Sequence, residues 1–186
     1  MRADIAFGPK NMGLSDSEIE RRVVESAEIV GLKKTDLDRS PFELSGGQKR
    51  RAALAGVLAM EPEVLVLDEP MAGLDPEGRR AIMQYVKDYH KKHNTTVIFV
   101  THSMEDAAQN AQRLIVMDRG RVLMQGTPEQ VFERADELRA SGLDTPQVTD
   151  LFSALRARGI DVPQSVYTVE QAVRCLRALK GGDSNA

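Results

Sequence analysis

Two adjacent carboxylates, Asp68 and Glu69, directly follow the apolar run from Val64 to Leu67. A short continuous apolar run predicts a strand of a parallel sheet that is buried on both faces. Ligands of open α/β sheets bind at the carboxyl ends of such strands. Two neighbouring carboxylates repel one another unless a cation lies close, and Mg²⁺ prefers oxygen ligands and keeps several waters. We therefore expect Asp68 to hold Mg²⁺, mainly through water, and Glu69 to polarise an attacking water. The alternative is a solvated acidic turn.

His102 follows a second apolar run, from Thr96 to Val100. The carboxyl ends of parallel strands lie at the same edge of a sheet, so this histidine is predicted at the same edge as the acidic pair. An imidazole there can donate a hydrogen bond to a γ-phosphate oxygen and orient water. The alternative is a surface histidine beside a helix cap.

Ser45, Gly46, Gly47 and Gln48 begin a run of helix-forming residues. Glycines let backbone N–H groups approach phosphate oxygens closely, and a helix N-terminus directs partial positive charge at them. The alternative is an ordinary N-cap with glycine neighbours. A phosphate loop of the form G-x-x-x-x-G-K-[ST], which would supply a lysine, occurs nowhere in the 186 residues.

The elements that must position these residues alternate between strands and helices. Strands are predicted at 64–67 and 96–100, with a helix between them that begins at Asp75-Pro76, and this βαβ order predicts a parallel sheet covered by helices. The other predicted elements are a loop at 1–14, a helix from Ser15 to Gly31, a loop at 32–44, a helix at 45–60, a short helix capped by Ser103, a hairpin at 113–126, and three helices opened by Thr127, Thr145 and Thr168.

Composition excludes several classes of protein. The net charge of −3 gives no general basic footprint for nucleic acid. The apolar runs are too short to cross a bilayer, and the first residues lack the layout of a signal peptide. A single cysteine excludes a disulfide within the chain and indicates a reducing compartment.

Four segments, taken in order and spacing, resemble ATP-binding cassette ATPases. They are LSGGQ at 44–48, VLVLDEP at 64–70, AGLDP at 72–76 and THSMEDA at 101–107, which look like the signature motif, Walker B, D-loop and H-loop of that family. The finer resemblance is to the ATPase subunit of energy-coupling factor transporters, which import vitamins and metal ions such as cobalt. It rests on DIAFGPKNMGLS at 4–15, GVLAMEPEVLVLDEP at 56–70 and TPQVTDLFSALRARGIDVP at 145–163, so it covers nearly the whole chain.

The resemblance implies an α/β fold, namely a partial P-loop NTPase with a parallel sheet, a helical signature subdomain and a C-terminal helical appendix. The implied boundaries are 1–126 for the ATPase domain, 15–60 for the subdomain within it, and 127–186 for a dimerisation appendix. The family's cofactors are ATP and Mg²⁺, and its activity is ATP hydrolysis.

The resemblance also implies how each site residue works. Two ATPase subunits of the family meet head to tail with two ATP molecules between them. Asp68 would hold Mg²⁺, and Glu69 and His102 would act on the ATP of this chain. Asp75 would reach across the interface. The signature residues would contact the ATP of the neighbouring subunit: Ser45, Gly46, Gly47 and Gln48.

The partners implied are a second ATPase subunit, an integral-membrane energy-coupling T component and a substrate-binding S component, with no nucleic acid. The chain would act at the cytoplasmic face of the cell membrane. A groove for helices of the membrane partner would have Phe7, Gly8 and Pro9 in its wall.

Two departures from the family pattern are present. Met71 stands where the family usually has threonine. The Walker A loop, the adenine-stacking aromatic and the Q-loop glutamine, which should precede residue 4, are missing. We therefore expect a fragment truncated before Walker A that is inactive alone.

Two other functions are weighed against a transporter ATPase. A non-catalytic partner could supply its signature segment in trans to an intact ATPase. A DNA-repair or chromosome-structure ATPase shares the motifs but carries long coiled coils between them, and the interval from Gly47 to His102 has no room for one.

Overall fold

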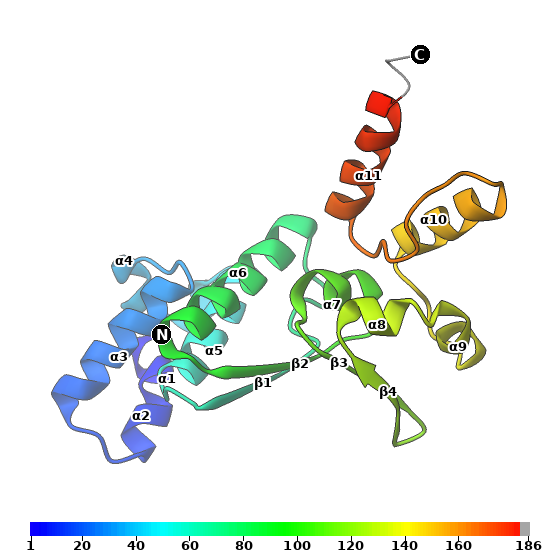
Figure 1. Ribbon diagram of the computed structural model, residues 1–186. Coiled ribbons are helices and arrows are strands. Elements are labelled where there is room, and N and C mark those ends of the chain that lie inside the picture. The colour runs from blue at the N-terminus through cyan, green and yellow to red at the C-terminus, as the bar shows by residue number, and fades with distance from the viewer. Residues whose placement is uncertain (183–186) are drawn as a thin grey trace. The chain divides into compact units, whose positions relative to one another are not determined.

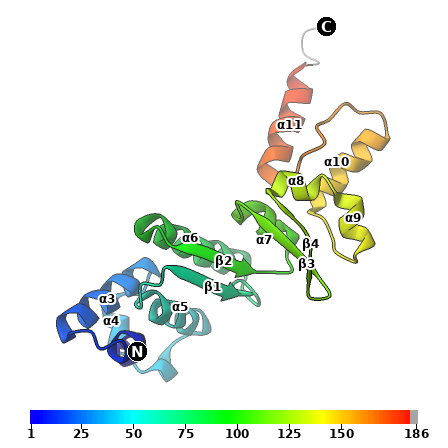
Figure 2. The same ribbon diagram turned by 60° about the horizontal axis from the view of Figure 1, so that its bottom comes forward.

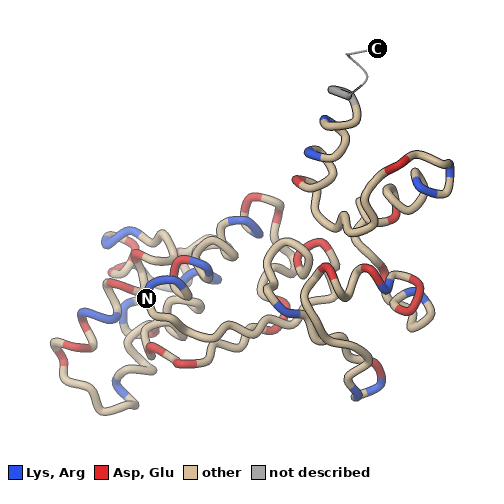
Figure 3. The backbone as a smooth tube through the Cα atoms, in the orientation of Figure 1, with Lys and Arg blue, Asp and Glu red and all other residues tan. Residues whose placement is uncertain are grey.

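The computed structural model of the chain describes residues 1–182. The chain divides into two compact units, Met1–Val100 and Thr101–Ala186. Figure 3 shows acidic and basic residues interspersed along the backbone of both units, in keeping with the small net charge. The ATPase domain at 1–126, the subdomain at 15–60 and the appendix at 127–186 remain predictions.

The first unit combines a short sheet with helices (Figure 1). Its elements in chain order are α1 (Arg2–Ile5), α2 (Phe7–Asn11), α3 (Asp16–Ile29), α4 (Lys34–Leu37), the 3₁₀ turn η1 (Pro41–Glu43), α5 (Gly46–Leu58), β1 (Val64–Asp68), α6 (Pro76–His93) and β2 (Thr96–Val100).

The sheet of the first unit is parallel, as predicted. Strands β1 and β2 pair in register from Val64 opposite Thr96 to Asp68 opposite Val100, and α6 connects them. Figure 2 shows the two strands side by side. Their carboxyl ends therefore lie at one edge, where β1 ends at Asp68, the first residue of the acidic pair.

The prediction that both strands are buried on both faces is wrong. Leu65 is buried in a core formed with α1, α3, α5 and α6, and Leu67 and Val97 pack against that core. The side chains that alternate with them are about half exposed or more, because the described residues cover only one face of this two-stranded sheet: Val64, Val66, Ile98 and Val100.

The second unit contains a hairpin and helices. Its elements are α7 (Met104–Asn110), β3 (Leu114–Asp118), β4 (Arg121–Gly126), α8 (Pro128–Phe132), α9 (Ala135–Ala140), α10 (Gln147–Ala157) and α11 (Val169–Gly182). Strands β3 and β4 form the predicted antiparallel hairpin. One cluster of buried side chains lies under the hairpin and α8, and another joins α10 to α11.

Most helix starts follow local capping chemistry. Six side-chain oxygens each accept a hydrogen bond from the backbone N–H three residues later: those of Ser15, Ser45, Asp75, Ser103, Thr127 and Thr168. Such caps satisfy N–H groups that have no partner within the helix. The helices predicted from these residues are therefore confirmed. Thr145 is different, because its hydroxyl donates to Asp150 and α10 begins only after Pro146.

Three other segments differ from the sequence prediction. Residues 1–14 contain α1 and α2 rather than a loop, since Pro9 lies in the first turn of α2, where a backbone N–H is not needed. Within the predicted loop at 32–44, α4 forms because Leu37 is buried and Asp36 accepts from the Lys33 N–H. Helix α9 begins without a side-chain cap, so no cap residue marked it.

Candidate functional site

The end of β1 places the acidic pair at the carboxyl edge of the sheet. Asp68 is the last residue of β1 and is exposed. The Glu69 N–H donates to the Val100 carbonyl over 2.9 Å, which extends the pairing with β2 by one bond. Glu69 has a φ of 45°, a left-handed conformation that is uncommon outside glycine and that concentrates at functional sites.

The segment from Glu69 to Asp75 is a series of tight turns. The Ala72 N–H donates to the Glu69 carbonyl over 3.1 Å, and the Leu74 N–H donates to the Met71 carbonyl over 3.3 Å. Gly73 has a φ of 71°, which explains the glycine there. Met71 is buried at 3% exposure, so the departure from threonine is accommodated inside the unit. Asp75 is exposed and caps α6 by accepting from the Gly78 N–H over 2.7 Å.

The start of α5 forms a complete capping box. Ser45 Oγ accepts from the Gln48 N–H over 3.2 Å, and Gln48 Oε1 accepts from the Ser45 N–H over 3.0 Å. The ordinary N-cap considered as the alternative is thus present.

The cap does not explain the two glycines. Gly46 and Gly47 are exposed and lie within α5, and a Cβ atom at either would meet nothing within 4 Å. Neither has a positive φ. Glycine in a helix costs about 0.5–1 kcal/mol relative to alanine, and neither packing nor backbone conformation in this chain requires it. Close approach of a molecule from outside would require it.

Arg50, one turn into α5, connects the start of α5 to the turns that follow β1. This residue was not identified from the sequence. Its guanidinium donates to the carbonyls of Glu69, over 3.1 Å, and Ala72, over 2.9 Å, and also to that of Pro70. No local pattern marks the contact, because the partners are about 20 positions away along the chain.

His102 is the second residue of the second unit and lies two positions after the end of β2. Its side chain is exposed, and the next residue, Ser103, caps α7. The role of His102 at the site stays a prediction.

The donor set fits a magnesium ion that is held mainly by water and phosphate. No cluster of three or more His, Cys, Asp or Glu side chains suited to a metal occurs among residues 1–182. Mg²⁺ commonly binds through one or two carboxylates together with phosphates and waters. The exposed Asp68 is such a carboxylate.

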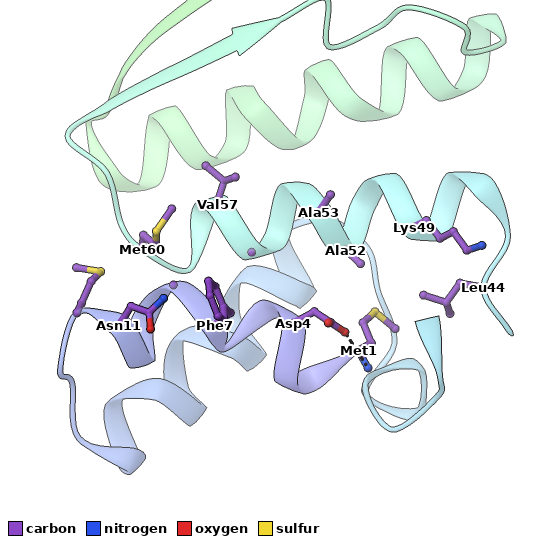
Figure 4. A pocket seen from close by; sticks show the side chains of 13 residues that line it. Met1, Asp4, Phe7, Asn11, Leu44, Lys49, Ala52, Ala53, Val57 and Met60 are labelled. Atoms are coloured by element: carbon purple, nitrogen blue, oxygen red, sulfur yellow. Dashed lines mark ion pairs between the residues drawn. The ribbon is translucent and has the colours of Figure 1, made fainter. Parts of the chain in front are cut away.

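A groove of about 670 Å³ lies between α1, α2 and the side of α5 (Figure 4). Its wall includes Phe7, Met12 and Val57, whose side chains are 67%, 52% and 38% exposed. Asp4 and Lys49 contribute charges of opposite sign. Phe7 and Gly8, two of the predicted wall residues, line this groove; Pro9 is buried instead.

Comparisons with known proteins agree with the motifs. Residues 13–105, half of the chain, match a family model described as "AAA domain, putative AbiEii toxin, Type IV TA system". The chain is 54% identical over 170 residues to the energy-coupling factor transporter ATP-binding protein EcfA2 of Clostridium tetani, covering 91% of this chain and 59% of that protein. It is 52% identical over 179 residues to EcfA2 of Caldanaerobacter subterraneus, covering 96% and 63%. The chain thus spans about 60% of the length of these relatives.

Solved structures give the same result for the fold. The structure of cbiO1 from Clostridium perfringens, described as part of the ABC transporter complex cbiONQ, matches with a TM-score of 0.64 and 39% identity, covering 80% of this chain and 59% of that one. MJ0796, a bacterial ABC transporter cassette solved as a dimer, matches with a TM-score of 0.53 and 30% identity, covering 62% and 49%. A further MJ0796 structure contains ADP and Pi. The predicted fold class is confirmed.

Among residues 1–182, none of the helices combines the length and the apolar character that a bilayer crossing requires.

Proposed function

Given that the chain belongs to the ATP-binding cassette ATPases, in the energy-coupling factor group, we propose that it couples ATP hydrolysis to the uptake of vitamins or metal ions across the cell membrane. It would do so at the cytoplasmic face, as a peripheral subunit. The observation that carries this proposal is the identity of more than 50% with EcfA2 proteins over more than 90% of the chain.

The acidic edge of the sheet would serve the ATP of this chain. Asp68 would hold Mg²⁺ through water, and the ion would neutralise phosphate charge. Glu69 would accept a proton from the attacking water, and His102 would donate a hydrogen bond to the γ-phosphate. The position of the two acids at the carboxyl end of β1, Asp68 as its last residue and Glu69 directly after it, supports this assignment.

The start of α5 would serve the ATP of a neighbouring ATPase subunit. The N–H groups of Gly46 and Gly47 would approach phosphate oxygens, and Ser45 and Gln48 would add side-chain contacts. The exposed glycines, which this chain's own packing does not require, support this role. Asp75 would reach across the same interface.

A second candidate function is supply of the signature segment in trans without catalysis. It is supported by the exposed glycines at the start of α5, which the packing of this chain does not require. The two functions differ in whether Glu69 matters, since a non-catalytic partner needs only the start of α5.

The ATPase rate of the assembled two-ATPase complex separates these functions. Under the main proposal, Glu69→Gln and Ser45→Arg each lower kcat, the first by about 100-fold or more because a general base is lost. If only Ser45→Arg has an effect, the chain is a non-catalytic partner. Glu63→Gln, an exposed carboxylate just before β1, is the matched control. An unchanged rate in both variants contradicts both functions.

Two surfaces would bind partners. The groove beside α5 would receive a helix of the membrane T component, which acts with the S component. The apolar stripe of α11 would contact the second ATPase subunit, since four of its side chains are 40–53% exposed: Val169, Val173, Leu176 and Leu179.

Two matched substitutions test these surfaces by co-purification. Val57→Glu places a charge in the groove and should release the membrane components while the second ATPase subunit stays bound. Val173→Glu on α11 should have the opposite result. Each variant is the control for the other. Loss of both partners from either variant would show general misfolding, which circular dichroism would detect, and retention of both would refute the assignment of that surface.

A further inference from the structure

Arg50 makes an unusual set of contacts between distant segments. From α5 its guanidinium reaches three backbone carbonyls, those of Glu69, Pro70 and Ala72. Arginine presents five N–H donors in a planar fork, so one side chain can satisfy several acceptors in a fixed arrangement. Residues 69–72, hereafter the 69–72 loop, are thus held from outside their own segment.

The 69–72 loop needs such support because its first residue is strained. Glu69 has a φ of 45°, and a non-glycine residue keeps this conformation only when its surroundings fix it. On one side, the Glu69 N–H is held by the Val100 carbonyl. On the other side, the Glu69 carbonyl accepts from both the Ala72 N–H and Arg50.

The direction of the Glu69 side chain follows from this backbone. Rotating the peptide groups around Glu69 would turn its Cα–Cβ bond and move the carboxylate by ångströms. Misplacement of a reacting group by about 1 Å can cost about 100-fold in rate. The contacts of Arg50 therefore act on the placement of the Glu69 carboxylate through the backbone that carries it.

We propose that Arg50 is a positioning residue for Glu69. By binding the carbonyls of the 69–72 loop, it fixes the backbone from which Glu69 accepts the proton of the attacking water. The inference rests on the proposed function and deepens it. It also links two sites, because Arg50 lies on the helix whose start would contact the neighbour's ATP, while its hydrogen bonds act on the acid that serves the chain's own ATP.

Kinetics of the assembled two-ATPase complex test this role. Arg50→Met keeps the aliphatic stem and removes every donor. We expect kcat to fall by about tenfold or more while KM for ATP changes by less than about twofold. Arg50→Lys can donate to only some of the carbonyls, so its kcat should lie between that of Arg50→Met and that of the parent. Arg80→Met, an exposed arginine on α6, is the control.

A double variant shows whether Arg50 acts through Glu69. Once Glu69→Gln has removed the base, adding Arg50→Met should lower kcat no further, because residues that act as one unit are not additive. A further tenfold loss in the double variant overturns the proposal. An unchanged kcat in Glu69→Gln alone would instead refute the proposed function, so the two failures are distinguishable.

Amide hydrogen exchange on the 186-residue chain gives a readout that needs no activity. Arg50→Met should speed exchange at the Ala72 and Leu74 N–H groups by about tenfold relative to Arg80→Met, while amides in the middle of α6 stay unchanged. Equal exchange at Ala72 and Leu74 in the two variants would overturn the proposal. Faster exchange throughout α6 would also overturn it, because Arg50 would then support the whole unit.

Discussion

The start of α5 and the end of β1 are both proposed to contact ATP, yet they are built in different ways. The start of α5 is made by four consecutive residues that cap one another, and its glycines face outward. The end of β1 is strained at Glu69 and is fixed by contacts from β2 and α5. The first region is a product of local sequence, whereas the second depends on the packing of the whole unit.

The two ways of building suit the two different roles that are proposed for these regions. A region offered to a neighbouring subunit must keep its shape before that subunit arrives, and a local capping box provides that. A region that holds a reacting carboxylate needs precise placement, which packing and several long-range hydrogen bonds provide. The next three predictions test this contrast, from the largest expected effect to the smallest.

The core under β1 should control the strand end. Leu65 is 1% exposed and packs in the main cluster, whereas its neighbour Val66 is 61% exposed. Leu65→Ala should lower the free energy of unfolding by about 2–5 kcal/mol through lost burial and a cavity. Val66→Ala should change it by about 0.5 kcal/mol or less. Urea denaturation measures both, and equal losses would show that the outer face is also packed.

The glycines of the two regions should respond in opposite directions. Gly47→Ala should raise the free energy of unfolding by about 0.5 kcal/mol, since the Cβ meets nothing and alanine favours a helix. Gly73→Ala should lower it by about 1 kcal/mol, since φ is 71°. Thermal unfolding compares them. Despite its gain in stability, Gly47→Ala should lower the ATPase rate of the complex, and a stabilised variant with full activity would contradict the ligand role of Gly47.

A perturbation away from both regions should change stability only slightly, and only at pH values at which Glu25 is ionised. Glu25 on α3 forms an ion pair with Lys92 at the end of α6. The pKa of Glu25 is lowered mainly by its hydrogen bond to Lys92, with smaller effects of Arg21 and His93. Because the pKa of Glu25 is lower in the folded state than in the unfolded state, the ion pair stabilises the fold fully at pH values above the unfolded-state pKa of about 4.3. This stabilisation is lost as the pH falls through the folded-state pKa.

Lys92→Met should therefore lower the free energy of unfolding by a few tenths of a kcal/mol near neutral pH, as is usual for partly exposed pairs. The difference from the parent should shrink below about pH 4.3. Lys91→Met, an exposed neighbour, is the control. Urea denaturation at a series of pH values measures the difference, and a gap that widens in acid would contradict the stated direction.

Much of the fold was predictable because its signals are local. Capping residues such as Ser15 and Asp75 fix helix starts through bonds to residues three positions away. The order of strand, helix and strand around α6 predicted the parallel pairing of β1 with β2. The helices α1, α2, α4 and α9 were missed because burial or an uncapped turn, rather than a recognisable capping residue, determines them.

The sequence by itself determined the family, the residue types at each end of the site and the capping box at Ser45, because each depends on neighbours along the chain. Only the tertiary structure decided that Glu69 takes a left-handed conformation and that Arg50 binds the loop behind it. It also decided that one face of the short sheet lies open. These features depend on contacts between residues far apart in the chain, and such contacts leave no periodic trace in the sequence.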